Sequence, residues 1–151
     1  MIYLWHAETE SLDATVSKAK DHDAFHFDDG YASHFEAGMY LTAASKKGVF
    51  FIVSGWVGMP GFLDWDQIRA LASFGHEIGN HTAHHVWLGK VPWVPRMAEI
   101  AAAQDSIAAH TGQAPRSFAY PYGRIDAAAE EAVGRFDFDM ARGIKEVEAR
   151  K

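Results

Sequence analysis

Two short stretches of the sequence carry side chains whose types and spacing suit metal-assisted hydrolysis. The first is the pair Asp28 and Asp29, placed between an apolar run and Gly30. The second contains His81 and His85, four positions apart in GHEIGNHTAHH. One carboxylate with two imidazoles is a sound ligand set for Zn, Fe, Co, Ni or Mn, and it leaves positions for water and a substrate oxygen. A second, uncoordinated carboxylate beside that water can act as a general base.

Each stretch also has an ordinary structural interpretation. Asp-Asp-Gly is most often a solvated turn, and a His-x3-His pair is often two exposed histidines. Adjacent carboxylates repel each other, and a bound cation would remove that repulsion. If a helical turn begins at His81, then His81 and His85 can face one point. A metal site therefore depends on whether the fold brings the two stretches together.

The elements that would position these residues alternate between short apolar runs and longer amphipathic ones. This alternation predicts an α/β fold with a largely parallel sheet. The expected strands span residues 2–5, 24–27, 48–54, 76–81, 117–121 and 137–142, and the expected helices span residues 31–47, 64–74, 95–110 and 126–133. Chemistry in such folds gathers beyond the carboxyl ends of the strands. Asp28, Asp29, His81 and residues 120–122 all lie at such ends, so they are predicted to share one site.

The overall composition bounds the class of protein. The chain has 151 residues, 48% of them hydrophobic, and we expect a single domain over residues 1–151. A net charge of -6 without a basic run argues against a nucleic-acid partner, and the lack of cysteine excludes disulfides and thiolate metal sites. No signal peptide or membrane span is visible, so the expected location is the cytoplasm without membrane insertion, or outside the cell if the chain was trimmed.

The ordered motifs resemble those of the polysaccharide deacetylase family, the NodB-homology members of carbohydrate esterase family 4. The family's Thr-Phe-Asp-Asp-Gly motif corresponds to residues 26–30, and its His-Ser/Thr-x-x-His motif corresponds to residues 81–85. A third motif of the Arg-x-x-Pro-Tyr type corresponds to FAYPYG at residues 118–123. The resemblance covers roughly residues 24–142. It implies a small, partly open (β/α) barrel with about six strands.

The resemblance also implies a role for each matching residue. Asp29, His81 and His85 would bind a divalent metal ion, expected to be zinc, although cobalt, nickel, iron and manganese also suit these ligands. Asp28 would act as the general base, and the backbone N–H of Tyr122 would help to stabilise the oxyanion. The implied reaction is hydrolysis of N-acetyl groups on an amino-sugar polysaccharide or oligosaccharide, and the implied partner is that N-acetylated glycan.

One departure from the family pattern concerns the arginine that steadies the catalytic aspartate in many members. Ala119 occupies its place here. Arg142 and Arg116 are the predicted substitutes, although for either residue an ordinary solvated surface charge is the simpler interpretation.

A second departure concerns the general acid. The family's C-terminal Leu-x-His motif is not found after residue 143, but Leu-Trp-His at residues 4–6 has the same pattern near the N-terminus. The stretch IYLWH is similar to the opening strand of the circularly permuted poly-N-acetylglucosamine deacetylases. His6 is therefore predicted to protonate the leaving amine, a role that suits an imidazole because its pKa lies near neutrality.

Other functions fit parts of the same pattern. A related hydrolase could open small cyclic amides, and a non-catalytic carbohydrate-binding relative would account for the missing arginine, although binding alone needs no base beside a metal. An iron oxygenase also uses two histidines and a carboxylate, but the all-β barrels associated with that chemistry do not match this alternation of helices and strands.

A barrel this short could also leave sheet edges for a second copy of the chain to cover.

Overall fold

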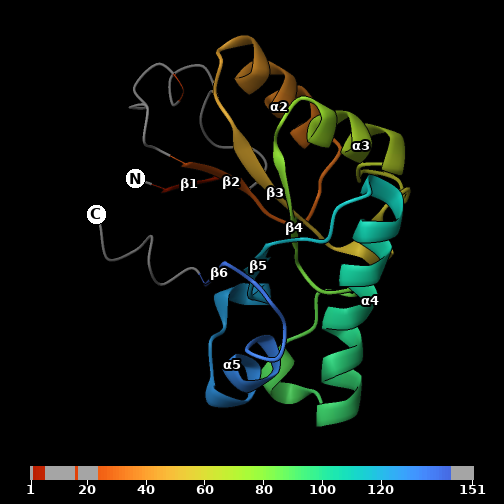
Figure 1. Ribbon diagram of the computed structural model, residues 1–151, viewed down its shortest axis with the longest axis vertical. Helices are drawn as coiled ribbons and strands as arrows, with labels where there is room; N and C mark the ends of the chain where they lie inside the picture. Colours follow the sequence, from red (N-terminus) through yellow and green to blue (C-terminus); the bar gives the residue numbers. More distant parts are fainter. Residues whose placement is uncertain (1, 6–15, 17–23, 144–151) are drawn as a thin grey trace.

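One curled parallel sheet forms the framework of the fold (Figure 1). The computed structural model describes residues 2–5, 16 and 24–143. Within these residues, six strands are ordered β1-β2-β3-β4-β5-β6, and every neighbouring pair is parallel. The strands are β1 (Ile2–Trp5), β2 (Ala24–Phe27), β3 (Gly48–Ile52), β4 (Glu77–Asn80), β5 (Ser117–Ala119) and β6 (Met140–Arg142).

From β2 onward, helices connect the parallel strands, as the crossover between two parallel strands requires. The α-helices are α2 (Ser33–Ala43), α3 (Trp65–Ser73), α4 (Trp93–Thr111) and α5 (Ala127–Val133). Short 3-10 helices are η1 (Ser54–Trp56), η2 (Leu88–Lys90) and η3 (Pro121–Gly123). Each α-helix packs against the next one along the outside of the sheet. Among the described residues, we found no helix with the length and apolar character needed to span a membrane.

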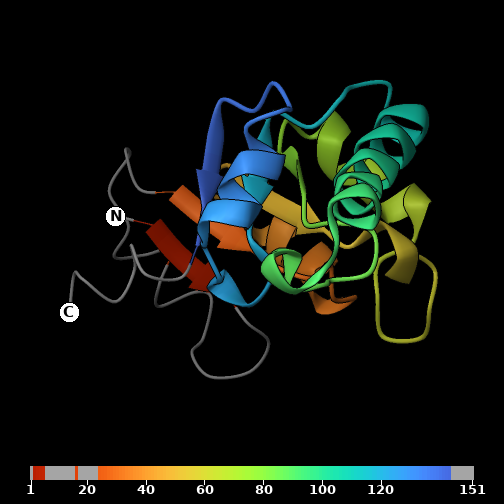
Figure 2. The same ribbon diagram turned by 90° about the horizontal axis from the view of Figure 1, so that it is seen from below.

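The sheet curls until its last strand approaches its second. Figure 2 shows β6 close to β1 and β2, although β1 and β6 are the two ends of the strand order. The approach is direct, because Nε of Arg142 on β6 donates a hydrogen bond of 2.8 Å to Nδ1 of His26 on β2. The fold is therefore a small, partly open (β/α) barrel, which confirms the prediction from the sequence.

Side chains along β2 point alternately into the hydrophobic core and toward the inner side of the curled sheet. Phe25 and Phe27 are buried in a core cluster that includes Leu41 of α2. Because side chains alternate along a strand, His26 and Asp28 lie on the opposite side, where Arg142 reaches them. A second cluster beneath α4 and α5 consists of Leu88, Ile100, Phe118, Tyr120, Ala129, Ala132 and Val133. The two clusters fix the sheet against its helices and leave the strand ends open to the site.

Aspartate side chains cap the N-termini of α3 and α5. Asp64 caps α3 by accepting from the backbone N–H of Gln67 at 2.8 Å, and the Gln67 side chain accepts from the Asp64 N–H at 3.0 Å. Asp126 caps α5 in the same way through the Ala129 N–H. Such caps stabilise a helix by about 1 kcal/mol each. They fix where α3 and α5 begin.

Several elements are shorter than the sequence predicted. β3 ends at Ile52, and β5 ends at Ala119, because the chain turns into η1 and η3 there. α2 begins only at Ser33, because Tyr31 forms an isolated antiparallel bridge with Phe62. Asp28 and Asp29 lie between β2 and α2, and His81 and His85 follow β4, so the candidate site is carried by the segments that leave these two strands.

Candidate active site

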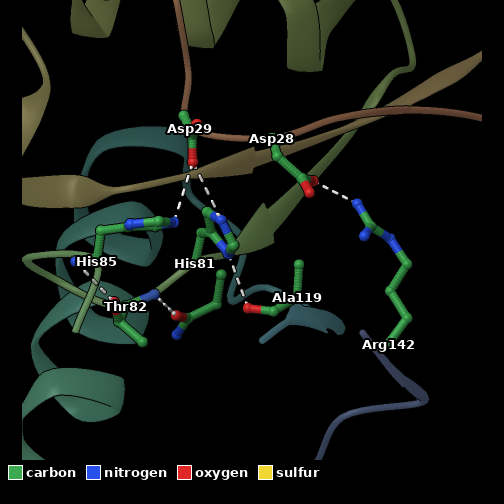
Figure 3. A network of polar contacts seen from close by, with 8 residues as sticks. Asp28, Asp29, His81, Thr82, His85, Ala119 and Arg142 are labelled. Carbon is green, nitrogen blue, oxygen red and sulfur yellow. Dashed lines mark hydrogen bonds and ion pairs between the residues drawn. The ribbon is translucent and has the colours of Figure 1, made fainter. Parts of the chain in front are cut away.

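Three side chains from two strand ends converge with their ligand atoms close together (Figure 3). Oδ1 of Asp29 lies 3.2 Å from Nε2 of His81 and 3.2 Å from Nε2 of His85. All three ligand atoms lie within 4.8 Å of one another. Two imidazole nitrogens and one carboxylate oxygen form a donor set that fits a divalent metal ion such as zinc. The structure thus brings together the three residues predicted to bind metal.

The backbone at these residues adopts conformations that are uncommon for non-glycine residues. Asp29, Thr82 and His85 have φ values of 75°, 67° and 55°. Such left-handed conformations are often found at functional sites, where the surrounding contacts hold them in place. The segment after His81 is therefore a series of bends and not the start of a helical turn, which corrects the expectation from the sequence. This irregular turn, and not a helix, brings the two imidazoles together.

Hydrogen bonds within the turn hold His85 in place. The Thr82 hydroxyl accepts from the backbone N–H of His85 at 3.0 Å, and the backbone N–H of Thr82 donates to Oδ1 of Asn80 at 2.8 Å. Asn80 is completely buried and donates from Nδ2 to the carbonyl oxygen of Ile100 at 3.0 Å and to Oε1 of Gln104 at 2.9 Å. The turn that carries both histidines is thereby attached to α4.

His84 lies on the outer side of the same turn. Its backbone N–H and its Nδ1 each lie 2.8 Å from a carboxylate oxygen of Glu99, and its side chain is 68% exposed. His84 is therefore separate from the cluster of Asp29, His81 and His85.

Hydrogen bonding prepares His81 to act as a ligand. Its Nδ1 lies 2.7 Å from the carbonyl oxygen of Ala119, which can only accept, so Nδ1 carries a proton. In the neutral imidazole, Nε2 then presents a lone pair toward Asp29. Metal-binding histidines commonly have this arrangement, with the other ring nitrogen donating to a carbonyl or carboxylate.

The protonation equilibria of the cluster follow from burial and mutual contacts. Burial and the neighbouring His81 lower the pKa of His85 below its ordinary value. Burial alone would raise the pKa of Asp29, but His81, His85 and the Tyr31 hydroxyl together hold it below its ordinary value. These shifts favour neutral imidazole and ionised carboxylate, the forms that bind a metal ion. Tyr31 was not predicted as part of the site, although it directly follows the Asp-Asp-Gly stretch.

The Asp28 carboxylate lies beside the cluster and contacts Arg142 (Figure 3). Nη2 of Arg142 donates to Oδ1 of Asp28, and both residues are buried. Arg142 is the register partner of Ala119, so the guanidinium comes from the strand next to the position where the family pattern has its arginine. Arg116 instead forms hydrogen bonds of 2.6 and 2.7 Å with Asp139 on the exposed surface. Of the two predicted substitutes, Arg142 is the one that contacts Asp28.

His26 is linked to Asp28 through Arg142, which donates a hydrogen bond to each of them. Burial and the charge of Arg142 lower the pKa of His26 to about 4, against the opposing effect of Asp28. No role for His26 was predicted from the sequence. Its position two residues before Asp28 on an expected strand was the available signal, because alternate residues face the same side of a sheet.

Tyr122 lies in η3, directly after β5. It has a φ of 58°, its ring centroid is 4.5 Å from that of His85, and its side chain is 58% exposed. Within this turn, the backbone N–H of Gly123 donates to the carbonyl oxygen of Tyr120, and that of Arg124 donates to the carbonyl oxygen of Pro121. Tyr122 therefore borders the cluster on the side open to solvent.

The predicted general acid, His6, lies outside the described residues. The strand that precedes it, β1, ends at Trp5, whose register partner on β2 is Phe27. Phe27 is the residue directly before Asp28. The chain therefore leaves β1 at the same end of the sheet as the aspartate pair.

Comparisons with known proteins agree with the geometry. A family model described as polysaccharide deacetylase matches residues 15–141. The chain belongs to the polysaccharide deacetylase family. A search of curated protein sequences gave no match. The family is of the carbohydrate esterase type, so the motif resemblance is confirmed at the level of the whole family.

Three solved structures share the fold. The deacetylase PplD of Streptococcus pyogenes, solved with acetate, is 20% identical with a TM-score of 0.74, and the match covers 91% of this chain and 63% of that one. IcaB of Ammonifex degensii is 27% identical with a TM-score of 0.70, covering 79% and 58%. The chitin deacetylase of Colletotrichum lindemuthianum is 22% identical with a TM-score of 0.70, covering 85% and 59%. The chain spans less than two thirds of each.

Proposed function

We propose that the protein is a metal-dependent hydrolase that removes N-acetyl groups from an amino-sugar polysaccharide or oligosaccharide. The observation that carries this proposal is the arrangement of two adjacent carboxylates. Asp29 joins two imidazoles in a metal-type donor set, and Asp28 beside it pairs with Arg142. A site that only binds glycans needs no second carboxylate next to a metal ligand. The family membership supports the same reaction class.

Asp29, His81 and His85 would hold the metal ion, which when bound supplies Lewis acidity toward the acetyl carbonyl and lowers the pKa of a water molecule. Asp28 would accept a proton from that water as general base. Its Oδ1 is held by Arg142, which leaves the other carboxylate oxygen for the proton. Zinc is the proposed ion, and the donor atoms are also compatible with cobalt, nickel, iron or manganese.

The oxyanion and the leaving amine need further groups. We place the backbone N–H of Tyr122 at the oxyanion, because η3 borders the cluster and a fixed amide can stabilise developing negative charge. His6 is proposed as the general acid that protonates the departing amine, because β1 ends beside the residue before Asp28. The products would be acetate and a glycan with a free amino group.

The substrate proposal rests on the family and its relatives. A chitin deacetylase shares the fold, so oligomers of N-acetylglucosamine are the first substrates to test. Partly exposed aromatic side chains border the cluster, including Trp56, whose ring centroid lies 5.3 Å from that of His85. Aromatic faces of this kind suit contact with the apolar face of a sugar ring.

Acetate release from N-acetylglucosamine oligomers by the zinc-loaded protein tests the proposal. His81→Ala should abolish release and zinc binding, whereas His84→Ala is a matched control on the same turn and should retain both. Zinc binding without acetate release, together with ring opening of small cyclic amides, would indicate the related hydrolase instead. Zinc binding with neither reaction would indicate a non-catalytic relative.

A further inference from the structure

Three buried side chains form a hydrogen-bonded chain behind the proposed general base. Arg142 donates from Nε to Nδ1 of His26 at 2.8 Å and from Nη2 to Oδ1 of Asp28. The relative exposures are 2% for Arg142, 2% for His26 and 5% for Asp28. Solvent therefore competes little for these contacts, and the orientation of the arginine depends on its protein partners.

The direction of the hydrogen bond fixes the form of His26. An arginine Nε–H can only donate, so Nδ1 of His26 must accept, and the neutral ring carries its proton on Nε2. A neutral acceptor satisfies the buried Nε–H of Arg142 without adding a second negative charge next to Asp28. A carboxylate at position 26 would leave an uncompensated buried charge, which is costly.

Phe51 limits the arginine from another direction. Cζ of Arg142 lies 4.6 Å from the centroid of the Phe51 ring, and the His26 ring packs against Phe51 at 5.4 Å between centroids. Phe51 therefore covers the guanidinium, and the bond to His26 restricts its rotation. With both contacts present, Nη2 is directed at Asp28 (Figure 3 shows this last contact).

We propose that His26 is a positioning residue for the reaction and acts through Arg142. This inference rests on the proposed function, because it concerns the orientation of the proposed general base. By holding the guanidinium on Oδ1, His26 keeps the Asp28 carboxylate in one orientation beside the metal ligands. Precise placement of a catalytic group affects the chemical step more than the binding of substrate.

The test compares two substitutions of His26 in the zinc-loaded protein, with acetate release from N-acetylglucosamine oligomers as the assay. His26→Leu removes the acceptor, and we expect kcat to fall about 10- to 100-fold, as for loss of a hydrogen bond to a charged group. KM should change less than about twofold, because substrate binding is not affected. His26→Gln supplies a side-chain oxygen that can accept from Nε, and it should recover most of the lost kcat.

An Arg142→Met background separates positioning from general destabilisation. If His26 acts only through Arg142, adding His26→Leu to Arg142→Met should lower kcat by less than about a further twofold. The Nε–H resonance of Arg142 gives a readout without substrate: its exchange with solvent should be slow in wild type and His26→Gln and fast in His26→Leu. If His26→Leu does not fold, His26→Ala takes its place with the same expected results.

Two outcomes overturn this inference alone: a His26→Leu variant with wild-type kcat, or equal losses from His26→Leu in the wild-type and Arg142→Met backgrounds. A zinc-loaded wild type that releases no acetate overturns the proposed function, and this inference fails with it. The activity of the wild-type protein thus distinguishes the two failures.

Discussion

Asp28 accepts a hydrogen bond from the guanidinium of Arg142 on the far edge of the sheet, whereas Asp29, its neighbour in the chain, faces two imidazoles (Figure 3). Asp29 also accepts from the hydroxyl of Tyr31. The pKa of His85 is lowered, which favours the neutral ring. Asp28 therefore has a permanent positive partner within the chain. Among the described contacts of Asp29 there is no permanent cation, so its surroundings suit a cation from outside. The difference assigns separate tasks to two residues that the sequence presents as a pair.

The supports of the two carboxylates also differ. Arg142 reaches Asp28 through buried contacts from β6. The histidines facing Asp29 are held by uncharged contacts: Ala119 accepts from His81, and Thr82 accepts from the backbone of His85. Loss of Arg142 should therefore affect catalysis without loss of metal, and loss of Thr82 should weaken metal binding first.

Asp28→Asn gives the largest expected effect on the reaction alone. The amide keeps the shape of the side chain but cannot accept a proton as a base, so kcat should fall about 100- to 10,000-fold. Zinc binding should remain, as measured by titration of the metal-free protein. A variant with nearly full kcat would falsify the separation of tasks between the two aspartates.

Arg142→Met should lower kcat about 10- to 100-fold, because a buried hydrogen bond to a charged group is lost at Asp28. Arg116→Met is the matched control, since Arg116 bonds to Asp139 on the surface and should leave kcat unchanged. Steady-state acetate release measures both. Equal effects from the two variants would remove Arg142 from the proposed mechanism.

Thr82→Val tests whether the hydroxyl of Thr82 helps to hold His85 in the cluster of Asp29, His81 and His85. Loss of the hydroxyl that accepts from the His85 backbone should weaken zinc affinity about 10- to 100-fold, the range seen for residues that orient metal ligands. Thr111→Val, at the end of α4, is the control and should leave affinity unchanged. Calorimetric titration with zinc compares them, and unchanged affinity in Thr82→Val would show that the turn does not depend on this contact.

His76 offers a contrast to the site histidines, because backbone contacts satisfy both of its ring nitrogens. Its Nδ1 accepts from the Gly48 N–H at 3.0 Å, and its Nε2 lies 2.9 Å from the Gly38 carbonyl oxygen. Burial lowers the pKa of His76 in the folded protein. The unfolded chain therefore binds the proton more readily, and the stability that neutral His76 contributes is lost as the pH falls below about 6.5.

The effect of His76→Gln should be the smallest among the four substitutions, after Asp28→Asn, Arg142→Met and Thr82→Val. The free energy of unfolding should fall between pH 7 and pH 5, and His76→Gln should reduce that fall. Urea unfolding at the two pH values measures the difference. An identical pH dependence in the variant would mean that other groups account for it.

The sheet and the convergence of Asp29, His81 and His85 could be predicted from the sequence because both depend on local patterns. Apolar runs marked β2 and β4, and the motifs marked Asp29, His81 and His85 at their ends. Parallel strands bring their carboxyl ends to one edge, so the convergence followed once the fold class was known.

The backbone of the histidine turn and the contact of His26 could not be predicted in the same way. The turn depends on positive φ values at Thr82 and His85, which hydrogen bonds to Asn80 and Thr82 stabilise. His26 meets Arg142 across 116 positions of sequence, and only the curl of the sheet brings them together. The spacing of His26 and Asp28 indicates that they share a side of the sheet, but the distance from His26 to Arg142 depends on the curvature of the whole sheet.

The most direct test of the account is the zinc content of three proteins after reconstitution and removal of excess metal: wild type, Asp28→Asn and Asp29→Asn. The account predicts stoichiometric zinc in wild type and in Asp28→Asn and almost none in Asp29→Asn, because only Asp29 shares the donor set with His81 and His85. Full zinc retention in Asp29→Asn, or its loss in Asp28→Asn, would contradict the assignment of the two aspartates.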